Sequence, residues 1–301
     1  MPLFEQLVSR TIMRVPGPLI GLFARNYIAG ETLEDALRAV RELNDQGIMA
    51  TIDLLGEDVG DLAGALRSRQ RCLGILDAIR REGLDANLSL KPTQMGLLPD
   101  RDAAFANIRA LVAHAASLGN FVRLDMEDRR CTDATIDFYR RLREEFPGHA
   151  GLVLQACLLR TPQDIEALSD APLNVRLCKG IYDEPRTIAW KLPDVINRSF
   201  VWCLEKLLRQ GAYAAIATHD SRLVFEATRL VREAGLTRER YEFQMLLGVD
   251  EELRRILLAQ GHRLRVYVPF GKAWLPYCRR RLKENPAIAR HALRQLLGDR
   301  G

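Results

Sequence analysis

Short apolar runs of the β type recur along the chain and alternate with longer stretches in which apolar residues have helical spacing. The eight runs lie at residues 48–56, 86–92, 121–126, 151–157, 174–179, 212–218, 240–246 and 264–270. Amphipathic stretches lie between them, at residues 61–82, 102–118, 135–146, 189–209, 223–234 and 250–259. Strands that alternate with helices are typical of βαβ units and a parallel sheet. Eight such units in ~240 residues predict a closed (β/α)8 barrel of the TIM type, an α/β fold.

The segments outside the strands predict additional helices but no second folding unit. Residues 1–45 precede the first run and predict two or three N-terminal helices, one of them over residues 31–44. The barrel is expected over about residues 46–290, and residues 287–297 predict a last helix. Neither a linker nor a low-complexity tract interrupts residues 1–301, and no G-x-G-x-x-G fingerprint follows the first strand. A single barrel domain is therefore expected, and not a doubly wound dinucleotide-binding sheet.

Composition narrows the class of protein further. Of the 301 residues, 48% are apolar and 28% are charged, as in a globular protein with a sizeable core. The net charge of +5 is spread along the chain, which favours anionic ligands or an anionic membrane surface over nucleic acid. The six cysteines have no C-x-x-C spacing, and no apolar window is long enough to span a membrane. We expect a cytoplasmic protein with reduced cysteines, whose contact with the inner membrane is at most peripheral.

Charged side chains interrupt several apolar runs near the carboxyl ends of the predicted strands. Lys91, Asp125 and Arg176 each lie where a doubly covered parallel strand would bury them. One such residue is usually a solvated rim residue, but three on separate strands are better explained by a polar pocket at the barrel mouth. In this fold the carboxyl ends of the strands form the active site. Further candidates at these ends are Asp53, Gly56, Glu57, Gln94, Met126, Glu127, Gln155, Lys179, Gly180, Tyr182, Thr218, His219, Asp220, Gln244, Gly248, Tyr267 and Gly271.

A helix expected after the eighth run carries an unusual polar face. Tyr277, Arg280, Arg281 and Glu284 have i, i+3, i+4, i+7 spacing and therefore share one side of that helix. Two adjacent guanidinium groups bind a carboxylate or a phosphate bidentately, which suggests a clamp for a small anion. The alternative is a solvated, ion-paired helix face in an arginine-rich protein, and the helix alone does not decide between the two.

The candidates as a set favour an anion-binding pocket over hydrolytic chemistry. Basic candidates outnumber acidic ones, which predicts a carboxylate substrate or a cofactor with phosphates. The basic residues are Lys91, Arg176, Arg280 and Arg281, and the acidic ones are Glu57, Asp125 and Glu284. No Asp/His cluster has metal-ligand spacing, and no nucleophile elbow accompanies a Ser-His-Asp arrangement.

Taken together and in order, the strand-end motifs resemble the proline dehydrogenase family, over about residues 48–290. The motifs are Asp53-Leu-Leu-Gly-Glu57, Lys91, Arg176-Leu-Cys-Lys-Gly-Ile-Tyr182, Ala217-Thr218-His219, Tyr241-Glu-Phe-Gln-Met-Leu-Leu-Gly248 and Tyr277-x-x-Arg280-Arg281-Leu-x-Glu284-Asn285. The length resembles the short monofunctional bacterial form. The resemblance implies a distorted (β/α)8 barrel that binds FAD and oxidises L-proline to Δ1-pyrroline-5-carboxylate, the first step of proline degradation to glutamate. Hydride would pass from C5 of proline to N5 of the flavin, and electrons then to a quinone.

The resemblance also implies a role for each matching position. Asp125 and Arg176 would be the catalytic polar residues beside the flavin. The implied substrate-binding residues are Lys91, Arg280 and Arg281 for the carboxylate, Tyr267, Tyr277 and Leu246 for the ring, and Glu57 as the partner of Arg280. The implied cofactor-binding residues are Met126, Gln155, Arg176, Lys179, Gly180, Ile181, Thr218, His219 and Glu284. Ile181 stands where the family usually has alanine, and residues 183–185 replace an aromatic found in some members, which bears on substrate preference and rate.

Three other interpretations stand beside this one. The chain also fits a flavin barrel oxidoreductase of the methylenetetrahydrofolate reductase type, or a Schiff-base aldolase that uses Lys91 or Lys179. A non-enzymatic barrel would require the charged strand ends to be coincidental. The small-anion clamp favours an amino acid substrate, and Tyr267 favours L-proline over hydroxyproline because a smaller residue there would admit the hydroxyl group.

Overall fold

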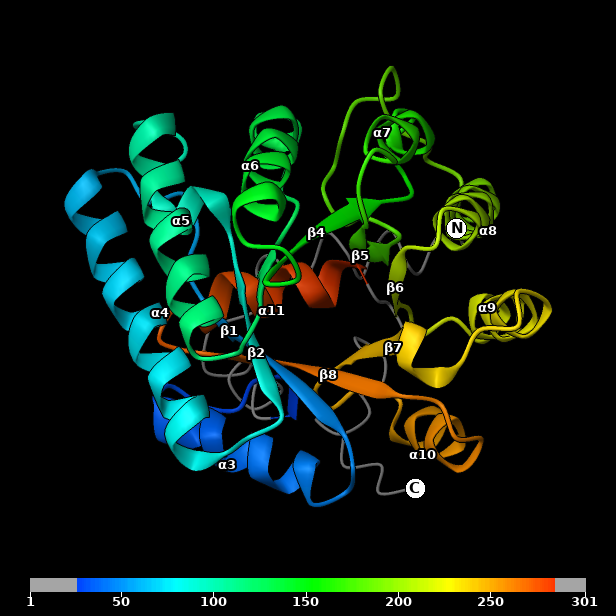
Figure 1. Ribbon diagram of the computed structural model, residues 1–301, viewed down its shortest axis with the longest axis horizontal. Coiled ribbons are helices and arrows are strands. Elements are labelled where there is room, and N and C mark those ends of the chain that lie inside the picture. Colours follow the sequence, from blue (N-terminus) through cyan, green and yellow to red (C-terminus); the bar gives the residue numbers. More distant parts are fainter. Residues whose placement is uncertain (1–25, 285–301) are drawn as a thin grey trace.

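The computed structural model describes residues 26–284, and for residues 280–284 it describes only the backbone. The predicted strands form a closed parallel barrel in chain order, in which β8 is hydrogen-bonded to β1 (Figure 1). The strands are β1 (Met49–Leu54), β2 (Ala86–Leu90), β3 (Val122–Leu124), β4 (Ala150–Gln155), β5 (Asn174–Cys178), β6 (Tyr213–Ala217), β7 (Tyr241–Leu246) and β8 (Leu264–Phe270). The (β/α)8 prediction is confirmed. Each expected run overlaps one strand, and only β4 begins before its run, by one residue.

The helices outside the barrel follow the predicted periodicity with one omission. The predicted segments correspond to α3 (Leu33–Asn44), α4 (Leu62–Glu82), α5 (Arg101–Ser117), α6 (Thr132–Glu145), α8 (Pro193–Arg209), α9 (Ser221–Glu233) and α10 (Glu251–Ala259). The sequence did not predict α7 (Thr161–Ala167), which has only 7 residues and therefore too few turns to show a period. The expectation of a helix from residue 189 was wrong at its start, because Ala189 forms a β-bridge with Leu158 and Pro193 begins α8. The other expected N-terminal helices and the one at 287–297 lie outside the described residues.

Local capping explains where the long helices begin and end. Thr32 and Asp35 form a capping box at the start of α3, since each side chain accepts a hydrogen bond from the backbone N–H of the other. The Asp61 side chain accepts from the backbone N–H of Gly64 at the start of α4, and Gly83 ends that helix with a left-handed φ of 64°. These contacts mark the start of α3 and both ends of α4.

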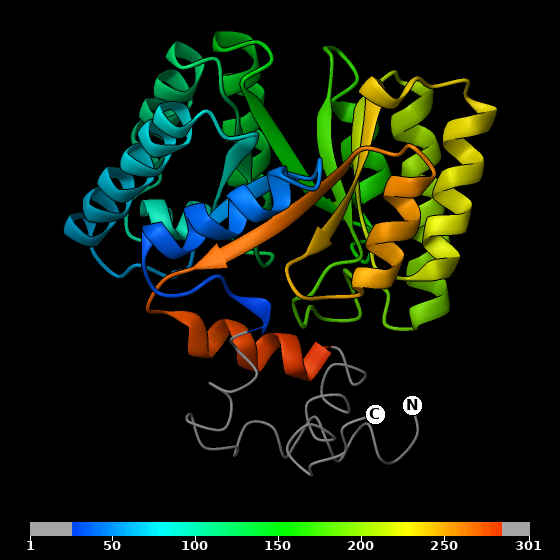
Figure 2. The ribbon, with the colours of Figure 1, turned by 90° about the horizontal axis from the view of Figure 1, so that it is seen from below.

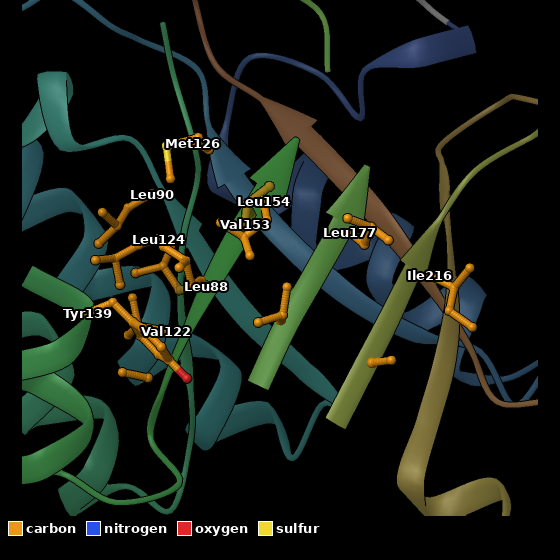
Figure 3. Packing of buried hydrophobic residues seen from close by; sticks show 14 of the residues in the cluster. Leu88, Leu90, Val122, Leu124, Met126, Tyr139, Val153, Leu154, Leu177 and Ile216 are labelled. Atoms are coloured by element: carbon orange, nitrogen blue, oxygen red, sulfur yellow. The ribbon is translucent and has the colours of Figure 1, made fainter. Parts of the chain in front are cut away.

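The hydrophobic core is a ring between the strands and the helices. Alternate residues of a strand face opposite sides, and the helix-facing residues of this barrel are apolar. They include Leu88, Leu90, Val122, Leu124, Leu154, Leu177 and Ile216, which Figure 3 shows among the core side chains together with Tyr139 of α6. The other face of the strands points into the barrel and is largely polar, although Val153 of that face belongs to the core cluster.

Helix α11 (Trp274–Glu284) follows β8 directly, as predicted. Figure 2 shows it (red) beneath the barrel, at the end toward which the arrowheads of β7 and β8 point. Its residue Tyr277 is buried, with 5% of its surface exposed. The helix therefore lies at the carboxyl end of the barrel. Among the described residues, no helix combines the length and apolar character needed to cross a bilayer.

Candidate active site

A buried ion pair lies at the carboxyl ends of β1 and β2. Nζ of Lys91 donates to both carboxylate oxygens of Asp53, at 2.9 and 3.1 Å, and lies 3.6 Å from Oδ2 of Asp125. The hydroxyl of Tyr267 on β8 is 3.4 Å from the same ammonium group and donates to Asp125 at 3.0 Å. Four strand ends thus place one ammonium group, two carboxylates and a phenol in contact.

A second set of contacts joins the same carboxylate to the opposite side of the barrel. Nη1 of Arg176 on β5 donates to Oδ1 of Asp125 at 2.8 Å and to the hydroxyl of Ser89 on β2 at 3.2 Å. Nε of Arg176 donates to Oε1 of Gln244 on β7 at 2.5 Å, and its guanidinium lies 5.2 Å from the centre of the Tyr267 ring. Within the described barrel, strand β5 is hydrogen-bonded only to β4 and β6, so the contacts of Arg176 with the other strands cross the barrel interior. The three charged residues singled out from the sequence therefore meet, as predicted.

The ionisation states at the mouth follow from burial and from these partners. Burial alone lowers the pKa of Lys91, but Asp53 and Asp125 outweigh it and raise that pKa above its ordinary value. Burial likewise opposes ionisation of Asp125, yet Arg176 and then Lys91 hold its pKa below the usual range. Burial and the neighbouring Asp125 carboxylate raise the pKa of Tyr267, which keeps its hydroxyl group a proton donor. The site therefore presents a permanent ammonium and guanidinium beside a carboxylate.

Asp53 was predicted to lie at a strand end, but not to be one of the carboxylates that balance the basic residues. The structure corrects this, because Asp53 is fully buried and is the nearest acidic partner of Lys91. Ser89 and Gln244, which hold Asp125 and Arg176, also had no assigned role. Residues that face the same side of a strand are two positions apart. The polar pairs Thr51/Asp53 and Ser89/Lys91 have this spacing, so the sequence did indicate that Asp53 and Ser89 face the barrel interior.

A deeper charged layer lies below the mouth and was missed entirely. Nε of Arg265 donates to Glu242 at 2.9 and 3.1 Å, and the hydroxyl of Tyr213 donates to the same carboxylate at 2.8 Å. Burial opposes the ionisation of Glu242, but Arg265 overcomes it and lowers the pKa to about 2. Gln244 Nε2 donates to Glu242 at 2.5 Å, so this layer is hydrogen-bonded to Arg176 through one amide.

Arg123 completes the deeper layer in an unusual environment. It is 2% exposed, donates to the backbone carbonyls of Leu152 and Asn174, and lies 4.8 Å from the Phe121 ring centre. Burial, and after it the charge of Arg176, lowers its pKa to about 9. Gly151 on the adjacent strand makes room for it, since a Cβ there would come within 2.5 Å of Nη1.

Apart from Glu284 of α11, the residues expected to bind the cofactor lie on β3 to β6 or directly after these strands. Met126, Gln155 and Thr218 are buried, whereas Lys179, Gly180, Ile181 and His219 are partly exposed. Gln155 Oε1 accepts from the backbone N–H of Ile181 at 3.4 Å, and Lys179 forms an ion pair with Asp220 at 2.7 Å. His219 Nε2 accepts a hydrogen bond from the backbone N–H of Leu246 at 2.9 Å. The predicted cofactor-binding residue His219 is therefore in direct contact with the predicted substrate-binding residue Leu246.

The residues expected around the substrate are only partly described. Leu246 and Tyr267 lie side by side as neighbours in the β7–β8 pairing, and both are partly exposed at the mouth. Glu57 is partly exposed in the loop between β1 and α4. The side chains of Arg280, Arg281 and Glu284 lie outside the described residues, so the expected pairing of Arg280 with Glu57 stays a prediction.

The residues present suit a bound polar cofactor such as FAD. Within the described residues, Nη2 of Arg176 is buried and has no hydrogen-bond partner, so it can donate to a bound acceptor. Gly180 has a left-handed φ of 99°, and a Cβ there would lie 2.3 Å from Sγ of Cys157. The backbone after β5 therefore passes close to β4 in a way that only glycine permits. No group of three or more described His, Cys, Asp or Glu residues is arranged to hold a metal ion.

A separate cavity of about 430 Å³ lies away from these residues. Most of its lining comes from the segments that precede β2, β3 and β4, including Asp85, Asn120 and His149, and Arg265 of β8 adds to it. It opens at the amino ends of the strands and contains none of the candidate substrate or cofactor residues. The convergence of charged side chains, and not this cavity, identifies the candidate site.

The protein is a (β/α)8 barrel whose ionisable residues gather at the carboxyl ends of the strands, where enzymes of this fold have their active sites. The fold and the site together therefore define an enzyme. A family model described as proline dehydrogenase matches residues 36–294. The chain is 37% identical to proline dehydrogenase 1 of Bacillus subtilis subsp. natto over 276 residues, covering 92% of this chain and 91% of that protein. It is 34% identical to the proline dehydrogenase of Deinococcus radiodurans over 278 residues, covering 91% and 90%. The chain belongs to the proline dehydrogenase family.

Two solved structures with a similar fold come from longer proteins. Proline utilization A from Bdellovibrio bacteriovorus superposes with a TM-score of 0.82 at 22% identity, over 87% of this chain and 32% of that one. Proline utilization A from Bradyrhizobium japonicum gives a TM-score of 0.74 at 21% identity, over 87% and 30%. The chain thus spans about a third of these proteins, and the likeness supports the barrel fold.

Proposed function

We propose that this chain oxidises L-proline to Δ1-pyrroline-5-carboxylate with bound FAD. The observation that carries the proposal is the position of Lys91, whose ammonium group is held by Asp53 and Asp125 beside Arg176 at the barrel mouth. A fixed ammonium group suits the carboxylate of a small amino acid, and family membership supports proline as that substrate. The reaction needs no protein nucleophile, only a precisely oriented ring and a two-electron acceptor.

In this proposal, the mouth residues divide into substrate-binding and cofactor-binding groups. Lys91 binds the proline carboxylate together with Arg280 and Arg281 of α11, and Glu57 pairs with Arg280 to close the site. The ring packs against Tyr267, Tyr277 and Leu246, while Asp125 and Arg176 are the polar groups nearest the reacting atoms. The proposed FAD-binding residues are Met126, Gln155, Arg176, Lys179, Gly180, Ile181, Thr218, His219 and Glu284.

The chemistry divides between the cofactor and the protein. When bound, FAD would supply the acceptor for the hydride that leaves C5 of proline, and the proline nitrogen would release its proton to solvent as the C5–N bond becomes a double bond. The guanidinium group of Arg176 is positively charged, which stabilises additional negative charge on a neighbouring group. Its Nη2 atom has no hydrogen-bond partner among the described residues. Lys91 and the α11 residues orient the ring, and the buried aromatic side chains exclude water.

A Schiff-base aldolase is the less favoured alternative. A lysine nucleophile must lose its proton near neutral pH, which requires a lowered pKa. The carboxylates of Asp53 and Asp125 instead raise the pKa of Lys91, and Lys179 is bound to Asp220 in an ion pair. Neither lysine has the environment of a Schiff-base residue.

A quinone is the proposed acceptor of the electrons from the reduced flavin, and L-proline and the quinone are the proposed partners. The net charge of +5 supports peripheral contact with an anionic inner membrane surface, with the rest of the protein in the cytoplasm.

The visible spectrum of the purified protein tests the proposal. A yellow protein that takes up FAD and is bleached by L-proline without oxygen is expected, and Lys91→Met should keep the colour but need a much higher proline concentration. Lys206→Met is the matched control, because Lys206 pairs with Glu166 on the helix layer far from the mouth. A colourless protein that does not take up FAD would refute the assignment, and bleaching by a folate but not by proline would favour the methylenetetrahydrofolate reductase type.

A further inference from the structure

Three loops at the barrel mouth converge on one buried threonine. Thr93 lies in the short 3-10 helix η1 (Pro92–Met95), which begins directly after Lys91. Its backbone N–H donates to Oε2 of Glu127 at 2.9 Å, and its hydroxyl donates to Oε1 at 2.6 Å. Thr93 is 1% exposed and Glu127 is 4% exposed, so this bidentate contact between the β2 and β3 loops is inside the protein.

The same threonine also holds the loop after β1. The backbone N–H of Asp58 donates to the Thr93 hydroxyl at 3.0 Å, and that of Val59 donates to its carbonyl at 3.4 Å. Asp58 has a φ of 48°, a left-handed conformation that is strained for a residue other than glycine. Since such a backbone persists only when its surroundings hold it, the contacts with Thr93 account for the shape of the loop that carries Glu57.

We propose that Glu127 and Thr93 form a positioning relay that fixes the β1–α4 loop, and with it Glu57, relative to Lys91 at the site mouth. Both are positioning residues, because each acts through the backbone of a neighbouring loop. The relay continues into β4, where the Gln155 side chain donates to the backbone carbonyl of Glu127 at 3.0 Å. Gln94, next to Thr93, adds a second tie to β1 by donating to the carbonyl of Leu54 at 2.9 Å.

Among the described residues, Glu127 is held by hydrogen bonds from Thr93 and not by an ion pair, which agrees with its role as a positioning residue. The charged groups that act on it are Lys91 of the β2 end and Glu57 of the β1–α4 loop, and burial is the strongest influence. A carboxylate is retained at a buried position because its two oxygens satisfy two donors of Thr93, which an apolar residue would leave unpaired. The raised pKa of Glu127, about 7, is the consequence of that burial.

Hydrogen–deuterium exchange of the peptide covering residues 55–61, combined with proline kinetics, tests the relay. Thr93→Val keeps the shape of the side chain but removes the hydroxyl, whereas Thr93→Ser keeps the hydroxyl. We expect exchange in this peptide to accelerate about tenfold in Thr93→Val and to change little in Thr93→Ser. The kinetic expectation, which rests on the proposed function, is a KM for proline raised about tenfold in Thr93→Val with a much smaller change in kcat.

Thr135→Val is the matched control, because Thr135 of α6 is also buried and donates its hydroxyl to a backbone carbonyl, that of the N-cap residue Cys131. It should leave both readouts unchanged. If Thr93→Val does not fold, Thr93→Ala is measured with the same expectation. Unchanged exchange at residues 55–61 in the folded variant would overturn the relay. Absence of proline oxidation in the unmodified protein would overturn the proposed function instead, and the exchange result would still decide the relay.

Discussion

Asp53 holds Lys91 by both carboxylate oxygens, at 2.9 and 3.1 Å, and its own side chain is fully buried. The two residues come from neighbouring strands, whose register pairs Asp53 with Ser89, two positions before Lys91. The ammonium group is therefore fixed relative to the barrel before any substrate binds. An ordered cation of this kind reduces the entropy that substrate binding must overcome.

Replacing Asp53 by Asn should destabilise the protein strongly. The change leaves the buried ammonium without its nearest carboxylate, and the free energy of unfolding should fall by about 3 kcal/mol. Adding Lys91→Met removes the buried ammonium group, which would keep only the longer contact of 3.6 Å with Asp125, and should recover much of that loss. Chemical denaturation measures both. The control is Asp137→Asn, which breaks an exposed ion pair with Arg101 and should lower the free energy of unfolding by less than about 1 kcal/mol. If Asp53→Asn lowered it by no more than this control, the prediction would be contradicted.

Glu127 should make stability fall as the pH rises from about 4.5 to about 7. Its pKa is raised from 4.5 to about 7 in the folded protein because of burial. Below 4.5 both folded and unfolded forms are protonated; above that pH the unfolded form loses its proton first, which favours unfolding. Relative to Glu127→Gln, the free energy of unfolding should decrease by about 3 kcal/mol across this range. Urea denaturation of both proteins at pH values across the range measures the difference, and parallel curves would contradict it.

Glu242 should have the opposite pH dependence. Its pKa is lowered from 4.5 to about 2, mainly by Arg265 acting against burial, so the ionised group stabilises the fold above pH 4.5. Glu242→Gln should lower the free energy of unfolding by about 3 kcal/mol at neutral pH, and the difference should vanish as the pH falls toward 2. Tyr213→Phe, which removes one donor to the same carboxylate, should cost only about 1 kcal/mol. A difference between Glu242→Gln and the unmodified protein that persists at pH 2 would show that packing, and not charge, is responsible.

Gly180 should not tolerate a side chain. A Cβ at this position would lie 2.3 Å from Sγ of Cys157, and φ is 99°. Gly180→Ala should lose about 3 kcal/mol or more of stability. Gly83→Ala is the matched control, since Gly83 is also left-handed but has nothing within 4 Å of the added Cβ, and a cost of about 1 kcal/mol is expected. Thermal denaturation compares the two, and equal shifts would show that backbone conformation alone sets the cost.

Most of the barrel was predictable because each strand and helix carries its own periodicity. The eight runs, the helices from α3 to α6 and from α8 to α10, and the position of α11 after β8 followed from local patterns of apolar residues. Helix α7 was missed because 7 residues give less than two full turns of pattern. The site was predictable to the level of Lys91, Asp125 and Arg176, since charges in doubly covered strands conflict with burial unless they meet.

The eight-unit barrel and the charged strand ends could be predicted because both depend on the local spacing of residues. Which of the charged groups face one another was settled only by the closed barrel. Tyr267 and Asp125 are 142 positions apart, and Arg176 and Ser89 are 87 apart, yet each pair is hydrogen-bonded. Such partners depend on the register of every intervening strand and on closure of β8 against β1, which no single segment encodes. For the same reason the buried Asp53 under Lys91 and the layer of Arg123, Glu242 and Arg265 became visible only in the closed barrel.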